Sequence, residues 1–167
     1  MSSEDPRRLD EPLTPTRFRE ACGRFATGVA IAGAMDRSGV PHGLTVNSFS
    51  SVSLDPPLVL ICLAHTATAI EVFRGATHFG LSLLSAHQKE LSDRFARKDS
   101  DRFDGVQWRR GITGVPLLAE SLAEIECAMK HIVRAGDHDI FIGQMVHATI
   151  REGEPLIYYA SRYRKLE

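Results

Sequence analysis

Residues 43–53 hold the densest set of side chains that could do chemistry in this chain of 167 residues. Six of them carry a hydroxyl or an amide, and they stand between two apolar runs that predict strands. Such side chains at the end of a strand offer hydrogen-bond donors and acceptors, and a bending backbone adds its own N–H groups. The residues alone leave two interpretations open, a ligand-binding edge or an ordinary loop rich in serine and threonine.

Two histidine clusters are the other candidates. Residues 65–68 read His-Thr-Ala-Thr after an apolar run, so they would open a helix whose amides and hydroxyls suit a phosphate. Helix capping by Thr66 or Thr68 explains the same residues without a ligand. His138 stands between two aspartates at the start of a predicted strand, a placement that suits a functional histidine or a surface histidine in a turn.

Several familiar active sites are absent from the sequence. It contains no GxGxxG, GxxxxGK[ST], GxSxG or HExxH motif, which argues against a Rossmann fold, a P-loop, an α/β-hydrolase and a helical zinc site. Cys22, Cys62 and Cys127 are far apart and show no metal-ligand spacing, so we expect neither a disulfide framework nor a metal. A net charge of −1 offers no basic excess for nucleic acid.

We expect a cytoplasmic protein that does not enter a membrane. Residues 1–11 are polar and contain no apolar segment of a secretion signal. The longest apolar run, residues 56–64, is too short to span a bilayer.

The predicted elements must hold these candidates in place. Thr14 and Pro15 are typical of a helix start, and Ser85 with Gln88 forms a capping box for a second helix. Alternating or continuous apolar residues predict strands at 29–34, 40–46, 58–63, 78–84, 122–133, 140–150 and 156–159.

Strands that do not alternate regularly with helices predict an antiparallel architecture. We therefore expect a mainly β fold, an antiparallel barrel with peripheral helices. Residues 53–57, which contain two prolines, should form a loop between strands. Residues 1–13 should form a flexible lead, and residues 14–167 a single domain.

The chain resembles the flavin reductase family, the short reductase components of two-component flavin-dependent monooxygenases. The resemblance rests on Thr-Val-Asn-Ser-Phe-Ser-Ser-Val-Ser at 45–53, followed by Asp-Pro-Pro-Leu-Val at 55–59. The other matching pieces are Phe18-Arg19, residues 25–29, residues 91–96, Gly136-Asp137-His138, residues 155–159 and Arg162-Tyr163. They follow the family's order and span residues 15–166.

This resemblance implies an FMN-binding split β-barrel that forms a homodimer and reduces FMN or FAD with NADH or NADPH. Hydride would pass from C4 of the nicotinamide to N5 of the flavin, while the protein stacks the two rings. Backbone N–H groups of residues 45–51 would stabilise the negative charge that reduction places on the flavin. The reduced flavin would go to a partner monooxygenase.

The resemblance also implies roles for individual residues. Those assigned to the flavin are Thr45, Val46, Asn47 and Ser48 at the isoalloxazine ring, Ser50, Ser51, His65 and Thr66 at the ribityl phosphate, and Phe95 and Arg97 along its far side. His138 and Tyr163 would flank the nicotinamide. We expect His138 to position the rings rather than to serve as a required base.

Two other functions remain open at this point. The same barrel could hold a flavin tightly for the oxidation of another substrate, or it could bind flavin or haem without catalysis. Flavin retained through gel filtration would favour a tightly bound flavoprotein. The residues do not distinguish FMN from FAD, or NADH from NADPH.

Overall fold

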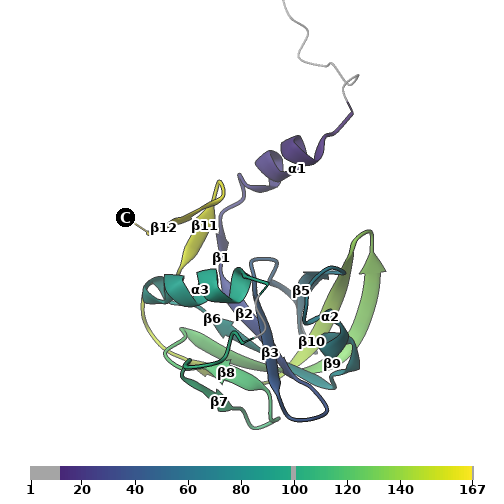
Figure 1. Cartoon of the computed structure of the whole chain (residues 1–167), viewed down its shortest axis with the longest axis vertical. Helices are drawn as coiled ribbons and strands as arrows, with labels where there is room; N and C mark the ends of the chain where they lie inside the picture. The colour runs from purple at the N-terminus through teal and green to yellow at the C-terminus, as the bar shows by residue number, and fades with distance from the viewer. Residues whose placement is uncertain (1–11, 99–100, 167) are drawn as a thin grey trace, which may run out of the picture.

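A computed structural model describes residues 12–98 and 101–166 of the chain. Strands account for most of the regular structure, and short helices lie at its periphery (Figure 1). The mainly β architecture expected from the sequence is confirmed. Most of the predicted N-terminal lead, residues 1–11, lies outside the described residues.

The body of the protein is a seven-stranded antiparallel sheet in the order β3-β2-β6-β9-β10-β5-β4. Its strands are β2 (Ala30–Met35), β3 (Pro41–Val46), β4 (Ser50–Leu54), β5 (Pro57–Ala64), β6 (His78–Leu83), β9 (Ala123–Ala135) and β10 (His138–Ile150). β2 and β3, which overlap the predicted strand segments 29–34 and 40–46, form one hairpin, and the long hairpin β9–β10 stands out at one side of the molecule (Figure 1).

The sheet curls until β3 meets β5. The hydroxyl of Ser48, which follows β3, accepts a hydrogen bond from the amide of Cys62 at 2.9 Å and donates one to the carbonyl of Cys62 at 3.1 Å. This side chain takes the place of a backbone ladder between the two strands. β4 continues beyond the junction as the edge partner of β5, so the barrel is split, as the resemblance implies.

Apolar side chains fill the interior of the barrel. Phe73, Phe79 and Phe141 have no exposed surface, and their ring centroids lie 5.8 to 6.3 Å apart around Phe73. Phe73 belongs to α2 (Ile70–Gly75), which thereby covers the core. β10 passes close to these rings because it has glycine at 143, where a Cβ atom would lie 2.5 Å from Phe79.

The two helices predicted from their first residues are present. α1 (Pro15–Cys22) begins after Thr14, whose side chain accepts a hydrogen bond from the amide of Arg17 at 3.2 Å. No residue of α1 is buried, and the helix stands away from the sheet (Figure 1). α3 (Lys89–Ala96) follows a 3₁₀ turn in which the side chain of Gln88 accepts a hydrogen bond from the amide of Ser85 at 3.0 Å.

Two local predictions are wrong. Residues 53–57 are not all loop, because β4 runs to residue 54 and β5 begins at Pro57. Proline is tolerated as the first residue of a strand, where no backbone N–H is needed for pairing with the neighbouring strand. Neither predicted threonine caps α2, whose N-cap is Ala69. The hydroxyl of Thr68 instead accepts a hydrogen bond from Arg102 at 3.1 Å.

Two small sheets complete the described structure. One has the order β1-β11-β12, formed by β1 (Thr27–Gly28), β11 (Ile157–Tyr159) and β12 (Arg162–Arg164). The other pairs β7 (Trp108–Arg110) with β8 (Pro116–Leu118). The C-terminal hairpin β11–β12 lies near α3, and this contact creates the site described next (Figure 1).

Candidate functional site

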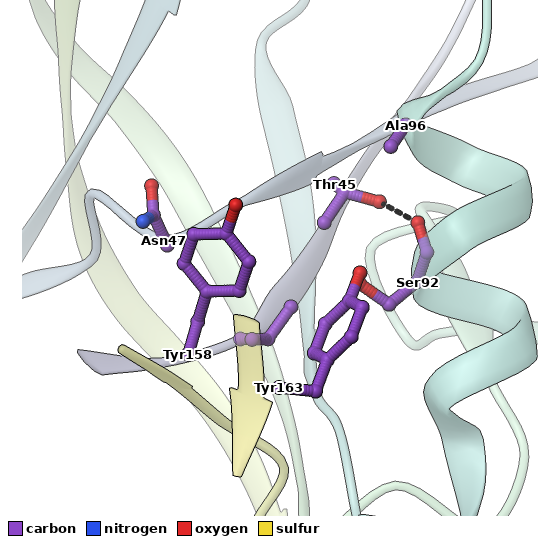
Figure 2. Close-up of a pocket in the computed structure, with 7 residues that line it drawn as sticks. Thr45, Asn47, Ser92, Ala96, Tyr158 and Tyr163 are labelled. Carbon is purple, nitrogen blue, oxygen red and sulfur yellow. Dashed lines mark hydrogen bonds between the residues drawn. The ribbon is translucent and has the colours of Figure 1, made fainter. Parts of the chain in front are cut away.

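A cavity of about 200 Å³ opens between β3, α3 and the C-terminal hairpin. We call it the β3 cavity, and its lining residues are Val29, Thr45, Asn47, Ser92, Ala96, Tyr158 and Tyr163 (Figure 2). It brings together three residues that the sequence assigned to the flavin or the nicotinamide, Thr45, Asn47 and Tyr163. They reach it from β3, from the segment after β3 and from β12.

Thr45 uses its hydroxyl inside the protein. The hydroxyl turns toward α3 and donates a hydrogen bond to the backbone carbonyl of Ser92 at 2.6 Å (Figure 2). A hydroxyl has one proton, so Thr45 has none left to donate to a ligand in the cavity. It shapes the wall of the cavity, and its two lone pairs can still accept hydrogen bonds.

Asn47 is the polar group that remains available. It is exposed, and its side chain makes no hydrogen bond with the rest of the described chain. It also lines a second cavity of about 320 Å³, the apolar cavity, which shares Val29 and Asn47 with the first and has Phe25 and Phe49 among its walls. The Asn47 amide, with two donors and one acceptor, stands where the two cavities join.

Tyr158 and Tyr163 form the wall opposite β3. Their ring centroids are 5.4 Å apart with the planes at 66°, and the Tyr163 phenol lies 2.8 Å from the hydroxyl of Ser92. The ammonium of Lys89 lies 5.1 Å from the centre of the Tyr163 ring. Burial raises the pKa of the Tyr163 phenol, which therefore keeps its proton at neutral pH.

Val46 and Phe95 are core residues. Val46 is 6% exposed and packs inside the barrel. Phe95 has no exposed surface, and its ring meets that of Phe103 edge to face at 4.9 Å. The packing of α3 turns this side chain inward, and its contact with the flavin stays a prediction from the resemblance.

Ser48, Ser50 and Ser51 do not enter the β3 cavity. Ser48 is committed to the junction of β3 with β5. Ser50 and Ser51 are exposed on the edge strand β4, and the hydroxyl of Ser50 donates to the carbonyl of Ser51 at 3.2 Å.

His65 belongs to an ion cluster at the end of β5. Its Nε2 lies 2.9 Å from a carboxylate oxygen of Asp139, which also accepts a hydrogen bond from Arg74 at 2.8 Å. Burial alone would raise the pKa of Asp139, but the hydrogen bonds from Arg74 and His65 outweigh it and hold the pKa below its ordinary value. Thr66 is exposed in the turn that follows.

A third cavity, the basic cavity, opens beside this turn with a volume of about 200 Å³. The polar side chains in its wall are His42, Thr68, Lys98 and Arg102. Arg102 is 8% exposed and bonds to Thr68 as well as to the carbonyl oxygen of Arg97. Arg97 itself is exposed and contributes its backbone to this cluster rather than its guanidinium.

His138 begins β10 and lies outside the β3 cavity of its own chain. Its Nδ1 is 2.7 Å from the carboxylate of Asp137, and its register partners are Ala64 and Ala135. It is half-buried on the face of β10 that turns away from the barrel core. This face also carries Ile140.

Four residues around the cavities were not assigned roles from the sequence. Ser92 and Tyr158 lie inside segments that match the family, but nothing in their spacing showed that they line the same cavity as Thr45. Lys98 and Arg102 stand in a polar stretch without periodicity, so no sequence signal pointed to a basic cavity. The bonds of Ser92 to Thr45 and Tyr163, and of Arg102 to Thr68, join segments far apart in the chain.

Two other kinds of site were sought in the described residues. No three His, Cys, Asp or Glu side chains there come together as ligands for a metal ion. No helix in residues 12–98 or 101–166 is long and apolar enough to cross a membrane.

Comparison with known proteins relates this architecture to one family. The chain is 47% identical over 135 residues to a probable flavin reductase of Rhizobium meliloti, covering 81% of this chain but only 43% of that longer relative. It is 36% identical over 158 residues to HsaB of Rhodococcus jostii, named as the reductase subunit of a flavin-dependent monooxygenase, covering 94% of this chain and 80% of HsaB.

A solved structure shares the fold. The NADH:FAD oxidoreductase SgcE6 of Streptomyces globisporus, in complex with NAD and FAD fragments, superposes with a TM-score of 0.88 at 36% identity, covering 94% of this chain and 97% of SgcE6. The flavin reductase like domain matches residues 22–167, which include every lining residue of the three cavities. The chain belongs to the flavin reductase like domain family.

Proposed function

We propose that this chain is an NAD(P)H:flavin oxidoreductase that reduces FMN or FAD and supplies the reduced flavin to a partner monooxygenase. Bound together, the two cofactors supply the chemistry, a hydride transfer from nicotinamide C4 to flavin N5. The observation that carries the proposal is the β3 cavity, which collects Thr45 and Asn47 from one motif of the family and Tyr163 from another. The kinship with reductases such as HsaB and SgcE6 supports it.

The cavities suit a flat aromatic ligand with one polar edge. Small-molecule sites usually measure about 300–1,000 Å³, and the β3 cavity with its apolar neighbour falls in this range. Tyr158 and Tyr163 offer apolar ring surfaces with polar tips. Asn47 offers the paired donor and acceptor that an imide edge, or a carboxamide, requires.

The basic cavity suits the phosphate of the flavin. Arg102 and Lys98 supply positive charge, and Thr68 lies in the same turn as His65 and Thr66, which the resemblance assigns to the ribityl phosphate. β3 lines both this cavity and the β3 cavity, and Lys98 of the basic cavity lies two residues after the end of α3. We therefore place the phosphate beside Arg102 rather than beside the exposed serines of β4.

A homodimer is part of the proposal, and an apolar outer face of the sheet supports it. Val133 is 47% exposed and lies opposite Ile140, which lies opposite Cys62. His138 stands at the end of the same face of β10. A second copy packed there would bring His138 against a partner, where it could complete the nicotinamide site. Val133→Asp should shift sedimentation velocity toward the monomer, and an unchanged dimer would exclude this face.

An anaerobic assay tests the activity. Purified protein is mixed with NADH or NADPH and an excess of FMN or FAD, and bleaching of the flavin is followed at its visible maximum. We expect bleaching over many turnovers, and the four combinations rank the substrates. Bleaching that stops at one equivalent would indicate a tightly bound flavoprotein instead, and no bleaching with any pair would reject the reductase.

A pair of matched variants tests the site. Asn47→Ala removes the available amide and should raise the KM for flavin or NAD(P)H by about three- to ten-fold, the contribution of one or two hydrogen bonds. Gln107→Ala removes an exposed amide that lines none of the three cavities and should leave both KM values unchanged. Equal kinetics in the two variants would exclude Asn47 from the site.

We also propose a cytoplasmic location. The free thiols of Cys22, Cys62 and Cys127 are consistent with a reducing compartment. Fractionation of the native host would test this, and recovery of the protein in an oxidising compartment would contradict it.

A further inference from the structure

Ser92 joins two walls of the β3 cavity from one position on α3. Its backbone carbonyl accepts the hydroxyl proton of Thr45 at 2.6 Å, and its own hydroxyl lies 2.8 Å from the phenol oxygen of Tyr163 (Figure 2). Ser92 has no exposed surface. Hydrogen bonds shielded from bulk water in this way hold their partners more firmly than exposed ones.

The C-terminal hairpin depends on this link. β12 is an edge strand of three residues that pairs with β11 alone in the described sheet. The turn before it places Ala160 and Ser161 at φ 49° and 61°, a conformation that costs energy for residues other than glycine. β11 is anchored by its pairing with β1, so the outer strand β12 relies on β11 and on the contacts of Tyr163 with Ser92 and Lys89 to stay against α3.

We propose that Ser92 is a positioning residue of the flavin site: by holding Tyr163 and Thr45, it sets the width of the β3 cavity and the affinity for flavin. The inference rests on the proposed function, because that function assigns the cavity to the flavin ring. Ser92→Ala releases only the tyrosine wall, since Thr45 bonds to the backbone carbonyl. Tyr163→Phe removes the same bond from the other side.

Titration with FMN and with FAD, followed by quenching of flavin fluorescence, measures the effect. The Kd should rise by about three- to ten-fold in Ser92→Ala and in Tyr163→Phe, the range that one neutral hydrogen bond supplies. The double variant should bind no more weakly than either single variant, because both substitutions remove one shared bond.

Tyr159→Phe is the matched control. It makes the same chemical change on the same hairpin, but successive strand residues point to opposite faces, so Tyr159 lies away from the cavity that Tyr158 lines. This variant should bind flavin like the wild type. Weaker flavin binding by Tyr159→Phe would mean that any change in the hairpin affects the site, and the specific role of Ser92 would be rejected.

Amide hydrogen exchange of the flavin-free protein gives a readout that does not depend on activity. Exchange in β11 and β12 should accelerate in Ser92→Ala and Tyr163→Phe but not in Tyr159→Phe. Faster exchange with an unchanged Kd would show that Ser92 holds the hairpin without positioning the flavin, and would overturn the inference.

Two remaining outcomes are also decisive. A wild-type protein that binds neither FMN nor FAD would overturn the proposed function, and the inference with it. Should Ser92→Ala fail to fold, Tyr163→Phe decides alone, because it removes the same bond from a side chain that is only half-buried.

Discussion

Replacing Phe95 by leucine separates a core role of this side chain from the flavin contact that the family resemblance implies. Phe95 has no exposed surface, and its ring meets that of Phe103 edge to face at 4.9 Å. Leucine loses this pair, worth about 0.5–1.5 kcal/mol beyond area burial. It also refits the core imperfectly, at a cost of up to about 1.5 kcal/mol. The free energy of unfolding should therefore fall by about 1–3 kcal/mol.

Urea unfolding followed by tryptophan fluorescence measures this loss. The single tryptophan, Trp108, is a suitable reporter because its ring lies 5.6 Å from that of Phe103. The midpoint should fall while the m-value stays constant, as expected when stability alone changes. A cycle of Phe95→Leu, Phe103→Leu and the double variant should show a coupling energy of about 0.5–1.5 kcal/mol.

Flavin affinity decides between the two roles of Phe95. If Phe95 only packs in the core, the Kd of Phe95→Leu for FMN should stay within about three-fold of the wild-type value while the urea midpoint of unfolding falls. If Phe95 touches the flavin, the Kd of Phe95→Leu for FMN should rise by about ten-fold, a loss of roughly 1.4 kcal/mol of binding free energy, while the unfolding midpoint stays unchanged. The second result would refute the reasoning from burial.

Three further changes test other parts of the structure. Gly143→Ala should lower the free energy of unfolding by about 1–3 kcal/mol in urea titration, because the new Cβ atom would lie 2.5 Å from the ring of Phe79. Ser161→Gly should slow hydrogen exchange in the C-terminal hairpin, because glycine adopts the φ of 61° without strain. The pKa of Asp139 is lower in the folded protein than in the unfolded chain, so its ionised form stabilises the fold at neutral pH. This contribution is lost as the pH falls below about 4, through the lowered pKa of the folded state. In Asp139→Asn, the free energy of unfolding should therefore decrease less steeply as the pH falls through this range.

Local signals in the sequence predicted the elements that depend on neighbours in the chain. The capping box of Ser85 and Gln88 predicted α3, and Thr14 with Pro15 predicted α1, because in each case the stabilising groups lie within four residues. The strands β2 and β3 were also predicted from their own apolar residues. The strand β1 was missed because its partner is remote: Thr27 pairs with Tyr158.

The candidate site, like the fold, was predicted only as far as neighbours in the chain determine it. The sequence identified the polar segment after β3 but not which of its side chains face a ligand. That choice depends on Ser92, which is 47 positions from Thr45, and on Cys62, which is 14 positions from Ser48. The sequence shows how many hydroxyl donors are present, but only the fold shows how many of them already donate to backbone carbonyls.

The hydroxyls of this segment therefore act differently from the sequence-based expectation. Thr45 donates to a helix carbonyl, and Ser48 closes the barrel. Both stiffen the rim of the cavity, and a rigid rim lowers the entropy that is lost when a ligand binds. Asn47, held between these two anchors and without a partner in the described chain, can then present its amide at a defined position. In the proposed site, the polar segment would support recognition mainly through the rigidity of its hydroxyl residues, and the single amide of Asn47 between them would make the contact.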